Sequence, residues 1–478
     1  MAKRQVHGFR TDQINGRVFA INAGNPNGLL RQLQGIPEFG SPYHMPFPPP
    51  RFVDDMRTAF IYAAFMAATA TSNPLVHAIE PSVTWASFRG ENASGVNTNC
   101  KVPLPWKKND IAWTINLPGA GNSSPIVVGN RLFVMSADPQ SAERYALAYE
   151  VATGNLLWKK PFGSNPHHLH RRSSYASSTP CANDKHVYFS WATPNAVTLK
   201  AFTHDGKLAW ETKQDQLGPF VSQHGYGASP VLFDDTVILF NSQQADQLPP
   251  NATPGQSVVL AFNANSGELL WKTPRTTRRA CYGVPTRYRD LSGRDLLLFA
   301  NTGDGLFALD FGTGEPVWNK QVFGKRSVSS PQVAAGLAIG TEGSGGGGNI
   351  LWAVDLEGDH EVRFKIDRSA PYVPTPVIKD DLMFLWGDTG IASCVSLPDG
   401  ETIWSRRIGG NVSTSPVIAG DRLMGIAEDG TVTILSATRE FQRLGSIQLK
   451  ETTRATPLVS DDFIVIRTNS RLICVGKP

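Results

Sequence analysis

The chain of 478 residues contains little cysteine and lacks the common catalytic and metal-binding motifs. Its five cysteines, Cys100, Cys181, Cys281, Cys394 and Cys474, are far apart, which excludes a CxxC redox pair, a zinc ribbon and a disulfide framework. We expect these cysteines to be buried or free thiols. GxSxG, HExxH, phosphate-loop and c-type haem motifs are also missing, so no hydrolase, metalloprotease or nucleotide site is indicated.

The chain also has no large excess of charge of one sign. It contains 45 Lys and Arg and 41 Asp and Glu, which gives a net charge of +4. A balance this close to neutral does not indicate a nucleic-acid partner. Apart from one stretch near the N-terminus, no apolar run approaches the length of a membrane span.

That one stretch, TAFIYAAFMAATATS, follows Met56 and Arg57 and precedes Ala78. A short basic start, a short apolar run and small residues at the end are typical of a secretory signal peptide, which we place at 56–78. A buried helix of an N-terminal domain is the alternative. Residues 1–55 are rich in Pro and Gly, and we interpret them as a non-native or disordered extension. We therefore expect a periplasmic or secreted chain with no transmembrane segment after cleavage.

The sequence does contain one short motif that is repeated eight times. A small residue and a proline lead into a short apolar strand, a polar turn and a second apolar strand. The prolines of these copies are Pro125, Pro180, Pro230, Pro285, Pro331, Pro376, Pro416 and Pro457. Their spacing of 40 to 55 residues, with several short strands in each unit, is typical of propeller blades. We read four strands per unit and predict an all-β, eight-bladed β-propeller over 110–478.

The last unit contains only three strands, while a lone strand around Trp113 stands twelve residues before Pro125. Most later units have the same Trp-to-Pro spacing, so this strand should be the fourth strand of blade eight. Pairing residues near 110–117 with 468–475 would close the ring and leave no open sheet edge. Residues 79–109 would lead into the propeller.

A second motif, small-Gly-x-x-x-Trp, ends most of the repeat units. It includes Trp158, Trp210, Trp271, Trp318 and Trp404, and Trp113 holds the same place in blade eight. We interpret these tryptophans as docking residues between blades, with Gly supplying a turn that other residues avoid. In the two units without Trp, we place Phe364 and Leu444 at the same position.

AYEVATGNLLW at Ala148–Trp158 and ALDFGTGEPVW at Ala308–Trp318 resemble the A-x-D-x-x-T-G-x-x-x-W motif of quinoprotein-like repeats. Such repeats occur in pyrroloquinoline quinone (PQQ) dehydrogenases and in BamB-type assembly proteins. WASFRGENASGV at Trp85–Val96 is similar to the segment that precedes the propeller in secreted bacterial members. The resemblance covers about residues 85–478 and implies the fold, but it does not decide between a catalytic and a non-catalytic role.

The dehydrogenases of this family share adjacent cysteines, calcium ligands and an aspartate base, and this sequence shows no such set. We therefore expect no cofactor, with PQQ and calcium as the alternative. Because this catalytic set is missing, the interpretation leans towards a non-catalytic protein. We expect a monomeric binding scaffold for a protein, peptide or anionic glycan. The alternative is a divergent PQQ-dependent dehydrogenase or a carbohydrate-active propeller enzyme.

The connections from a Trp strand to the next Pro strand are unusually long in two places, 22 residues before Pro180 and 20 before Pro230. By repeat register these connections emerge on one face, at the channel mouth. With the following connection they carry the predicted ligand-binding residues His170, Arg172, His224, Arg279 and Tyr282. Arg forks suit carboxylate, sulfate or phosphate oxygens. A histidine-bound metal and a solvated basic loop that binds nothing are the alternatives.

Overall fold

The computed structural model describes residues 84–193, 195–248 and 253–478. The chain divides into two units, residues 1–76 and 77–478, and all described residues belong to the second. The predicted extension (1–55), the predicted signal peptide (56–78) and the start of the lead-in segment therefore lie outside the described residues. Within the part of the chain that is described, no helix has the length and apolarity needed to cross a membrane.

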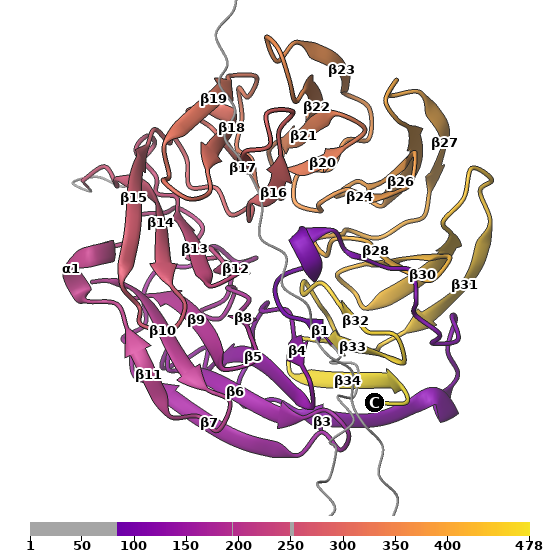
Figure 1. Ribbon diagram of the computed structural model, residues 1–478. Helices are drawn as coiled ribbons and strands as arrows, with labels where there is room; N and C mark the ends of the chain where they lie inside the picture. The colour runs from indigo at the N-terminus through magenta and orange to yellow at the C-terminus, as the bar shows by residue number, and fades with distance from the viewer. Residues whose placement is uncertain (1–83, 194, 249–252) are drawn as a thin grey trace, which may run out of the picture. The chain divides into compact units, whose positions relative to one another are not determined.

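Eight antiparallel sheets form the blades of a β-propeller, as the repeat predicts (Figure 1). From the innermost to the outermost strand, the first four blades are β4 (Ile126–Val128), β5 (Arg131–Ala137), β6 (Arg144–Glu150) and β7 (Leu156–Phe162); β8 (Cys181–Ala182), β9 (His186–Ala192), β10 (Val197–Thr203) and β11 (Leu208–Glu211); β12 (Val231–Phe233), β13 (Thr236–Asn241), β14 (Ser257–Asn263) and β15 (Leu269–Arg275); and β16 (Thr286–Arg289), β17 (Asp295–Asn301), β18 (Gly305–Asp310) and β19 (Pro316–Lys320).

The remaining blades follow the same order. They are β20 (Gln332–Ala334), β21 (Leu337–Glu342), β22 (Ile350–Asp355) and β23 (Val362–Ile366); β24 (Val377–Lys379), β25 (Leu382–Trp386), β26 (Ile391–Ser396) and β27 (Thr402–Arg407); β28 (Val417–Ala419), β29 (Arg422–Ile426), β30 (Thr431–Ser436) and β31 (Arg443–Gln448); and β32 (Leu458–Val459), β33 (Phe463–Arg467), β34 (Arg471–Gly476) and β3 (Ile111–Asn116). One short helix, α1 (Gln214–Leu217), lies between blades two and three.

The apolar runs of the sequence become the middle strands of the blades. In β5, six of seven residues are buried, because both faces of the strand lie against neighbouring blades. The outer strand β7 instead alternates between exposed and half-buried residues, since one of its faces meets solvent. The core is therefore a series of inter-blade layers rather than a single centre.

Ring closure is confirmed. Strand β3 pairs antiparallel with β34, with Trp113 opposite Cys474 and Asn116 opposite Arg471. The last blade thus takes its outer strand from the N-terminal side of the propeller and its three inner strands from the C-terminal end (Figure 1).

Each tryptophan of the repeat reaches the next blade. The indole Nε1 of Trp113 donates to the Val151 carbonyl at 2.8 Å, and that of Trp210 donates to the Ala264 carbonyl at 2.8 Å. The motif glycine allows this approach, because a Cβ at Gly154 would come within 2.9 Å of the Trp113 ring and the residue has a φ of +72°. Trp318 differs, since its ring stacks on His360 at 4.2 Å.

The placement of Leu444 at the tryptophan position is wrong. Phe364 pairs with Ala353 as Trp158 pairs with Ala148, but in blade seven the equivalent partner of Ile434 is Gly445. Pro105 of the lead-in segment covers this glycine, and a Cβ there would come within 2.6 Å of the proline ring. The lead-in segment therefore supplies the apolar group that the blade itself lacks.

The rest of that segment enters the central channel. Residues 84–97, here called the plug, contain β1 (Thr84–Trp85), which pairs with β4, and β2 (Val96–Asn97), which runs parallel to β28. Between them, the short 3-10 turn η1 (Glu91–Ala93) bonds to Arg287 of blade four through Asn92. The plug thus crosses the channel from blade one to blade seven, and it lies near the middle of the ring in Figure 1. A second 3-10 turn, η2 (Lys108–Asp110), precedes β3.

Arg89 fixes the plug. It is 1% exposed, and its guanidinium donates to the carbonyls of Ala93, Ser94, Pro376 and Pro416 at 2.8 to 3.0 Å. Two of these carbonyls belong to the plug and two to the inner edges of blades six and seven. Because the buried guanidinium is satisfied by main-chain oxygens, Arg89 is a structural residue.

A chain that begins at Ser123 should aggregate or melt at a lower temperature than a chain that begins at residue 77. It loses β3 and the plug, which exposes the edge of β34 and empties the channel. Size-exclusion chromatography and a thermal melt measure both effects. A monomer with an unchanged melting temperature would contradict the ring closure.

Trp210→Ala should lower the free energy of unfolding by about 3–5 kcal/mol, because this indole is buried between two blades. The matched control is Leu208→Ala on the same strand. Leu208 is 52% exposed, so its loss should change stability by only about 0.5 kcal/mol. Urea denaturation measures both variants, and equal effects would show that the tryptophan does not hold the blades together.

Candidate functional site

The connections between blades carry a ring of hydroxyl groups around the channel. In seven of the eight repeats, the residue before the proline is Ser or Thr, and its hydroxyl accepts a hydrogen bond from a backbone amide of the preceding blade at 2.9 to 3.1 Å. We call these residues the hydroxyl ring: Ser124, Thr179, Ser229, Ser330, Thr375, Ser415 and Thr456. Val284 holds the eighth place.

A cavity of about 360 Å³ lies at this mouth of the channel. All seven residues of the hydroxyl ring line it, and Phe88 of the plug lies among the lining residues. The cavity therefore ends against the plug and is a blind pocket rather than a pore. Its volume is within the range of pockets that hold small molecules or chain ends.

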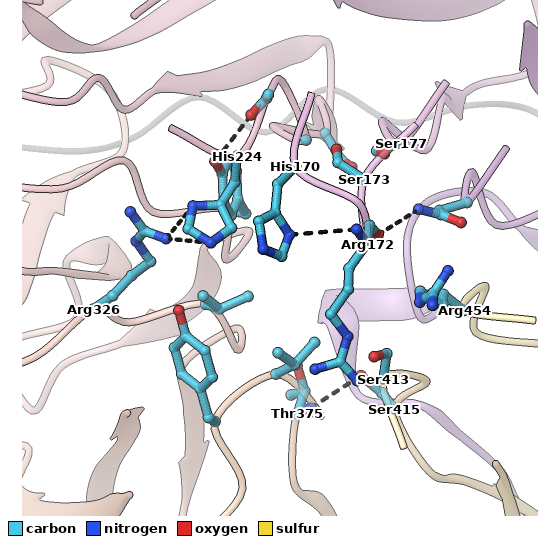
Figure 2. Close-up of a pocket in the computed structure, with 18 of the residues that line it drawn as sticks. His170, Arg172, Ser173, Ser177, His224, Arg326, Thr375, Ser413, Ser415 and Arg454 are labelled. Atoms are coloured by element: carbon cyan, nitrogen blue, oxygen red, sulfur yellow. Dashed lines mark hydrogen bonds between the residues drawn. The ribbon is translucent and has the colours of Figure 1, made fainter. Parts of the chain in front are cut away.

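All five predicted ligand-binding residues line this one cavity: His170, Arg172, His224, Arg279 and Tyr282. The two long connections bring the rings of His170 and His224 together at 4.5 Å between centroids. Figure 2 shows these rings side by side, between Arg326 and Arg172. The HHxH run does not gather as a metal set, because the His167 ring turns to Asn165 and the His168 ring to Gln223.

The two predicted arginines are paired with other side chains. Arg172 reaches Glu428 of blade seven, which also accepts from Arg454 at 3.1 Å and from Ser413 at 2.5 Å. Arg279 bonds to Gln247 and lies 3.8 Å from Asp246. Each of these guanidinium groups is therefore at least partly compensated.

Arg326 is different, and the sequence reasoning missed it. The residue is 3% exposed, its Nη1 donates to Nδ1 of His224 at 2.6 Å, and its Nε and Nη2 have no partner among the described residues. The three other buried arginines all donate to main-chain carbonyls. Arg89 donates to four, Arg144 to three and Arg467 to two, although Nε and Nη2 of Arg467 also lack a partner among the described residues. No carbonyl or carboxylate receives the Arg326 side chain within the described ranges.

The electrostatics of the cavity are accordingly one-sided. Four arginines and two histidines line it, and the described lining residues include no Asp or Glu. Burial, with Arg326 and His170 beside it, lowers the pKa of His224 to about 4. Burial and the neighbouring Arg171 and Arg172 lower the pKa of His170 as well. Both rings are therefore neutral at neutral pH, and they accept hydrogen bonds rather than add charge.

Glu428 is the nearest counter-charge. Burial alone would raise its pKa, but Ser413 and the guanidinium groups of Arg454 and Arg172 together lower it below the ordinary value. A single ionised carboxylate thus serves two arginines. Taken together, the mouth is a donor-rich pocket with positive charge to spare, which suits an anion.

The sequence could have indicated part of what was missed. Arg326 lies in a connection of ordinary length, five residues before Pro331, so loop length does not distinguish it. Arg454 lies in a similar short connection before Pro457. The Ser or Thr before seven of the prolines is visible in the sequence, but its role needs the ring geometry.

The described residues form neither a metal site nor a disulfide. In the described part of the chain, no group of three or more His, Cys, Asp and Glu side chains is placed to hold a metal ion. All five cysteines are free, and only Cys100 is more than slightly accessible.

Comparison with known proteins identifies the family of the repeats. The family model PQQ_2, described as outer membrane protein assembly factor BamB, matches residues 112–248, 255–347 and 342–476. A BamB from Burkholderia pseudomallei is 23% identical over 355 residues, which cover 67% of this chain and 86% of that protein.

A polyvinylalcohol dehydrogenase from a Pseudomonas species is 30% identical over 174 residues. That match covers 35% of this chain but only 25% of the dehydrogenase. Among solved structures, a europium-containing methanol dehydrogenase matches with a TM-score of 0.62 at 10% identity, over 82% of this chain and 98% of that one. BamB from Moraxella catarrhalis matches with a TM-score of 0.53 at 16% identity, over 77% and 97%. These structural likenesses show the fold alone.

The low pKa of His224 predicts a pH-dependent stability. The folded state binds fewer protons than the unfolded state between the ordinary histidine value of about 6.5 and the folded value of about 4, so stability should fall as the pH falls through this window. His224→Gln removes this group and should flatten the dependence. Thermal melts of both proteins from pH 7 to pH 4 measure it, and parallel curves would show that His224 does not titrate this way.

Proposed function

Because this chain belongs to the PQQ-like propeller family described as outer membrane protein assembly factor BamB, we propose that it is a non-catalytic binding module. Its channel mouth takes an anionic group of a protein, peptide or glycan partner. The chain acts as a monomer in the periplasm or outside the cell. BamB relatives, whose name is that of an assembly factor, support a scaffold role.

One observation carries this proposal: the buried guanidinium of Arg326 has no counter-ion within the described residues. Leaving a buried charge unpaired is costly, so such a group is retained in a fold when something else satisfies it. An anion that enters the mouth would meet Arg326 on one wall and Arg172 and Arg454 on another (Figure 2). The hydroxyl ring supplies further donors.

The second candidate is a divergent PQQ-dependent dehydrogenase, which the polyvinylalcohol dehydrogenase relative favours. The residues fit half of that chemistry. Arg172, Arg279, Arg326 and Arg454 suit the carboxylates of the quinone, which would supply the redox chemistry when bound. The described residues do not offer the acidic metal set, and no two cysteines are adjacent. We therefore derive no catalytic step for this chain.

Multivalent anions such as citrate should raise the melting temperature at low ionic strength, and the gain should shrink as sodium chloride is added. Arg326→Gln should abolish the gain, because it removes the unpaired charge. Arg406→Gln, an exposed position on the outer strand β27, changes the net charge equally and should keep it. Differential scanning fluorimetry of the three proteins measures the effect.

General salt effects on stability would appear equally in all three proteins and do not count as binding. If no multivalent anion gives a shift that depends on Arg326, the mouth is not a ligand site. Reconstitution with PQQ and calcium, followed by a dye-linked alcohol oxidation assay, tests the second candidate. Turnover that depends on the cofactor would overturn the non-catalytic assignment.

A further inference from the structure

We propose that the outer edge of β3 is a docking site for an extended segment of a protein partner, which adds to blade eight as a further strand. The partner strand runs antiparallel to β3 and brings acidic residues at its C-terminal end to Lys107 and Lys108. This inference goes beyond the proposed function, because it concerns the rim of the propeller and not the channel mouth.

Strand β3 is the outermost strand of its sheet. It pairs with β34 on one side, and no described residue pairs with the other side of its backbone. Half-buried and exposed side chains alternate along its six residues. Ile111, Trp113 and Ile115 pack against the core, so the strand is held in place. The unpaired N–H and C=O groups of such an edge can pair with another extended chain.

The other outer strands carry a protection that β3 lacks. Charged side chains on an edge strand discourage pairing with a further chain. Each of the other seven outer strands contains at least one charged residue: Lys159 in β7, Glu211 in β11, Lys272 in β15, Lys320 in β19, Lys365 in β23, Arg406 in β27 and Arg443 in β31. Strand β3 reads IAWTIN and contains neither a charged residue nor a proline.

The bulge in the outer hairpin does not account for this difference. A shift of register next to the outer strand occurs in all eight blades, so it protects none of them more than the others. The open edge of β3 is therefore a property of its own side chains.

Positive charge lies at one end of this edge. Lys107 and Lys108 are exposed and precede β3 closely. Asp110 is the only carboxylate in residues 101–117, and it accepts a hydrogen bond from the Lys107 backbone amide at 2.7 Å. In an antiparallel pair, the C-terminal end of the added strand lies beside the N-terminal end of β3. The two lysines therefore favour a partner whose strand ends in acidic residues.

A partner segment suits this edge better than a second copy of the chain. Two paired copies of a six-residue strand would by themselves bury much less than the roughly 1,200 Å² of a stable protein interface. An extended segment does not need such an area, because main-chain hydrogen bonds along the strand supply its affinity.

The edge also leads towards the channel mouth. The residues that follow β3 connect the outer strand of blade eight to the inner strand β4 of blade one, and Asn122 and Ser124 of this connection line the cavity. A strand that pairs antiparallel with β3 therefore begins beside this connection. One partner chain can thus occupy the edge and send the residues before its strand towards the mouth.

Fluorescence anisotropy of the full chain with a fluorescein-labelled peptide, TVTVTVEE, tests the proposal. TVPPTVEE has the same charge but lacks two central N–H donors, and it should bind at least about tenfold more weakly. EEVTVTVT has the same composition but carries its glutamates at the other end, and it should also bind more weakly. Equal binding of TVPPTVEE would overturn strand addition, and equal binding of EEVTVTVT would overturn the antiparallel orientation.

Thr114→Lys gives β3 the kind of charge that the other outer strands carry. It should weaken TVTVTVEE binding at least about tenfold, because an added strand would partly desolvate the ammonium group. The matched control is Asn319→Lys in blade four, which also follows the repeat tryptophan, is also exposed and should leave the affinity unchanged. Both variants should melt like the original protein. Unchanged binding by Thr114→Lys would overturn the assignment to this edge.

The double variant Lys107→Gln/Lys108→Gln tests the charge contact. At low ionic strength it should weaken TVTVTVEE binding by about three- to tenfold and leave the binding of TVTVTVQQ unchanged. An equal loss for both peptides, or no loss for either, would overturn the preference for an acidic partner.

Sedimentation velocity separates the possible occupants. A monomer that binds the peptide at β3 supports the partner segment. A dimer that Thr114→Lys dissociates would assign the edge to a second copy, and peptide binding only by a chain that begins at residue 77 would assign it to the preceding residues of this chain. Either result would overturn the proposal. The Arg326-dependent effect of citrate is a separate measurement, so failure of the docking site leaves the proposed function standing.

Discussion

The propeller depends on one repeated contact between neighbours: a backbone amide at the start of one inner strand donates to the hydroxyl at the start of the next. Seven such contacts run around the axis, including the step from Thr456 to Ser124 that joins the last blade to the first. At the outer edge, five of the six repeat tryptophans perform the corresponding task by donating to a carbonyl of the following blade, and Trp318 stacks on His360 of that blade instead. The blades are therefore held both at the axis and at the rim, and the sheets between them need only be apolar.

The candidate site at the channel mouth is a by-product of this arrangement. Because the hydroxyls are used as acceptors by the scaffold, their protons remain for the channel. The connections that deliver each hydroxyl also deliver the arginines and histidines above it, so the cationic residues converge although they are far apart in sequence. His224 and Arg326 are 102 residues apart and lie in hydrogen-bond contact. A rigid ring can hold an unpaired guanidinium that a looser fold would release to water.

The architecture could be predicted from the sequence because it rests on local signals that repeat. Eight small-Pro copies, the Trp spacing and the lone strand at Trp113 each follow from a few neighbouring residues, and the ring closure followed from counting strands. The loops that carry His170 and His224 were found because they are longer than the repeat needs. Arg326 was not found, because its importance lies in partners it lacks, and absent partners leave no pattern in a sequence.

The plug and the covering of Gly445 by Pro105 could not be predicted for a related reason. Both depend on a segment without a repeat of its own, whose contacts are with blades one, four and seven. The assignment of Leu444 to the tryptophan position failed because the β30–β31 hairpin is one residue longer than the β6–β7 hairpin: Gly445 lies eleven residues after its partner Ile434, whereas Trp158 lies ten after Ala148. A large apolar residue stands next to the true position, so the residue types alone pointed to the wrong one of the two.

Val284 gives the pocket a direction. Eight equal hydroxyls around an axis would offer a bound molecule eight equivalent orientations, and rotation among them would blur any specific recognition. A valine at one position removes this degeneracy, because Val284 packs into the core between blades three and four and leaves the hydroxyl ring without a donor there. The fold is thus close to eightfold symmetric in its backbone, while its hydroxyl ring has one gap from which an occupant's rotation about the axis can be set.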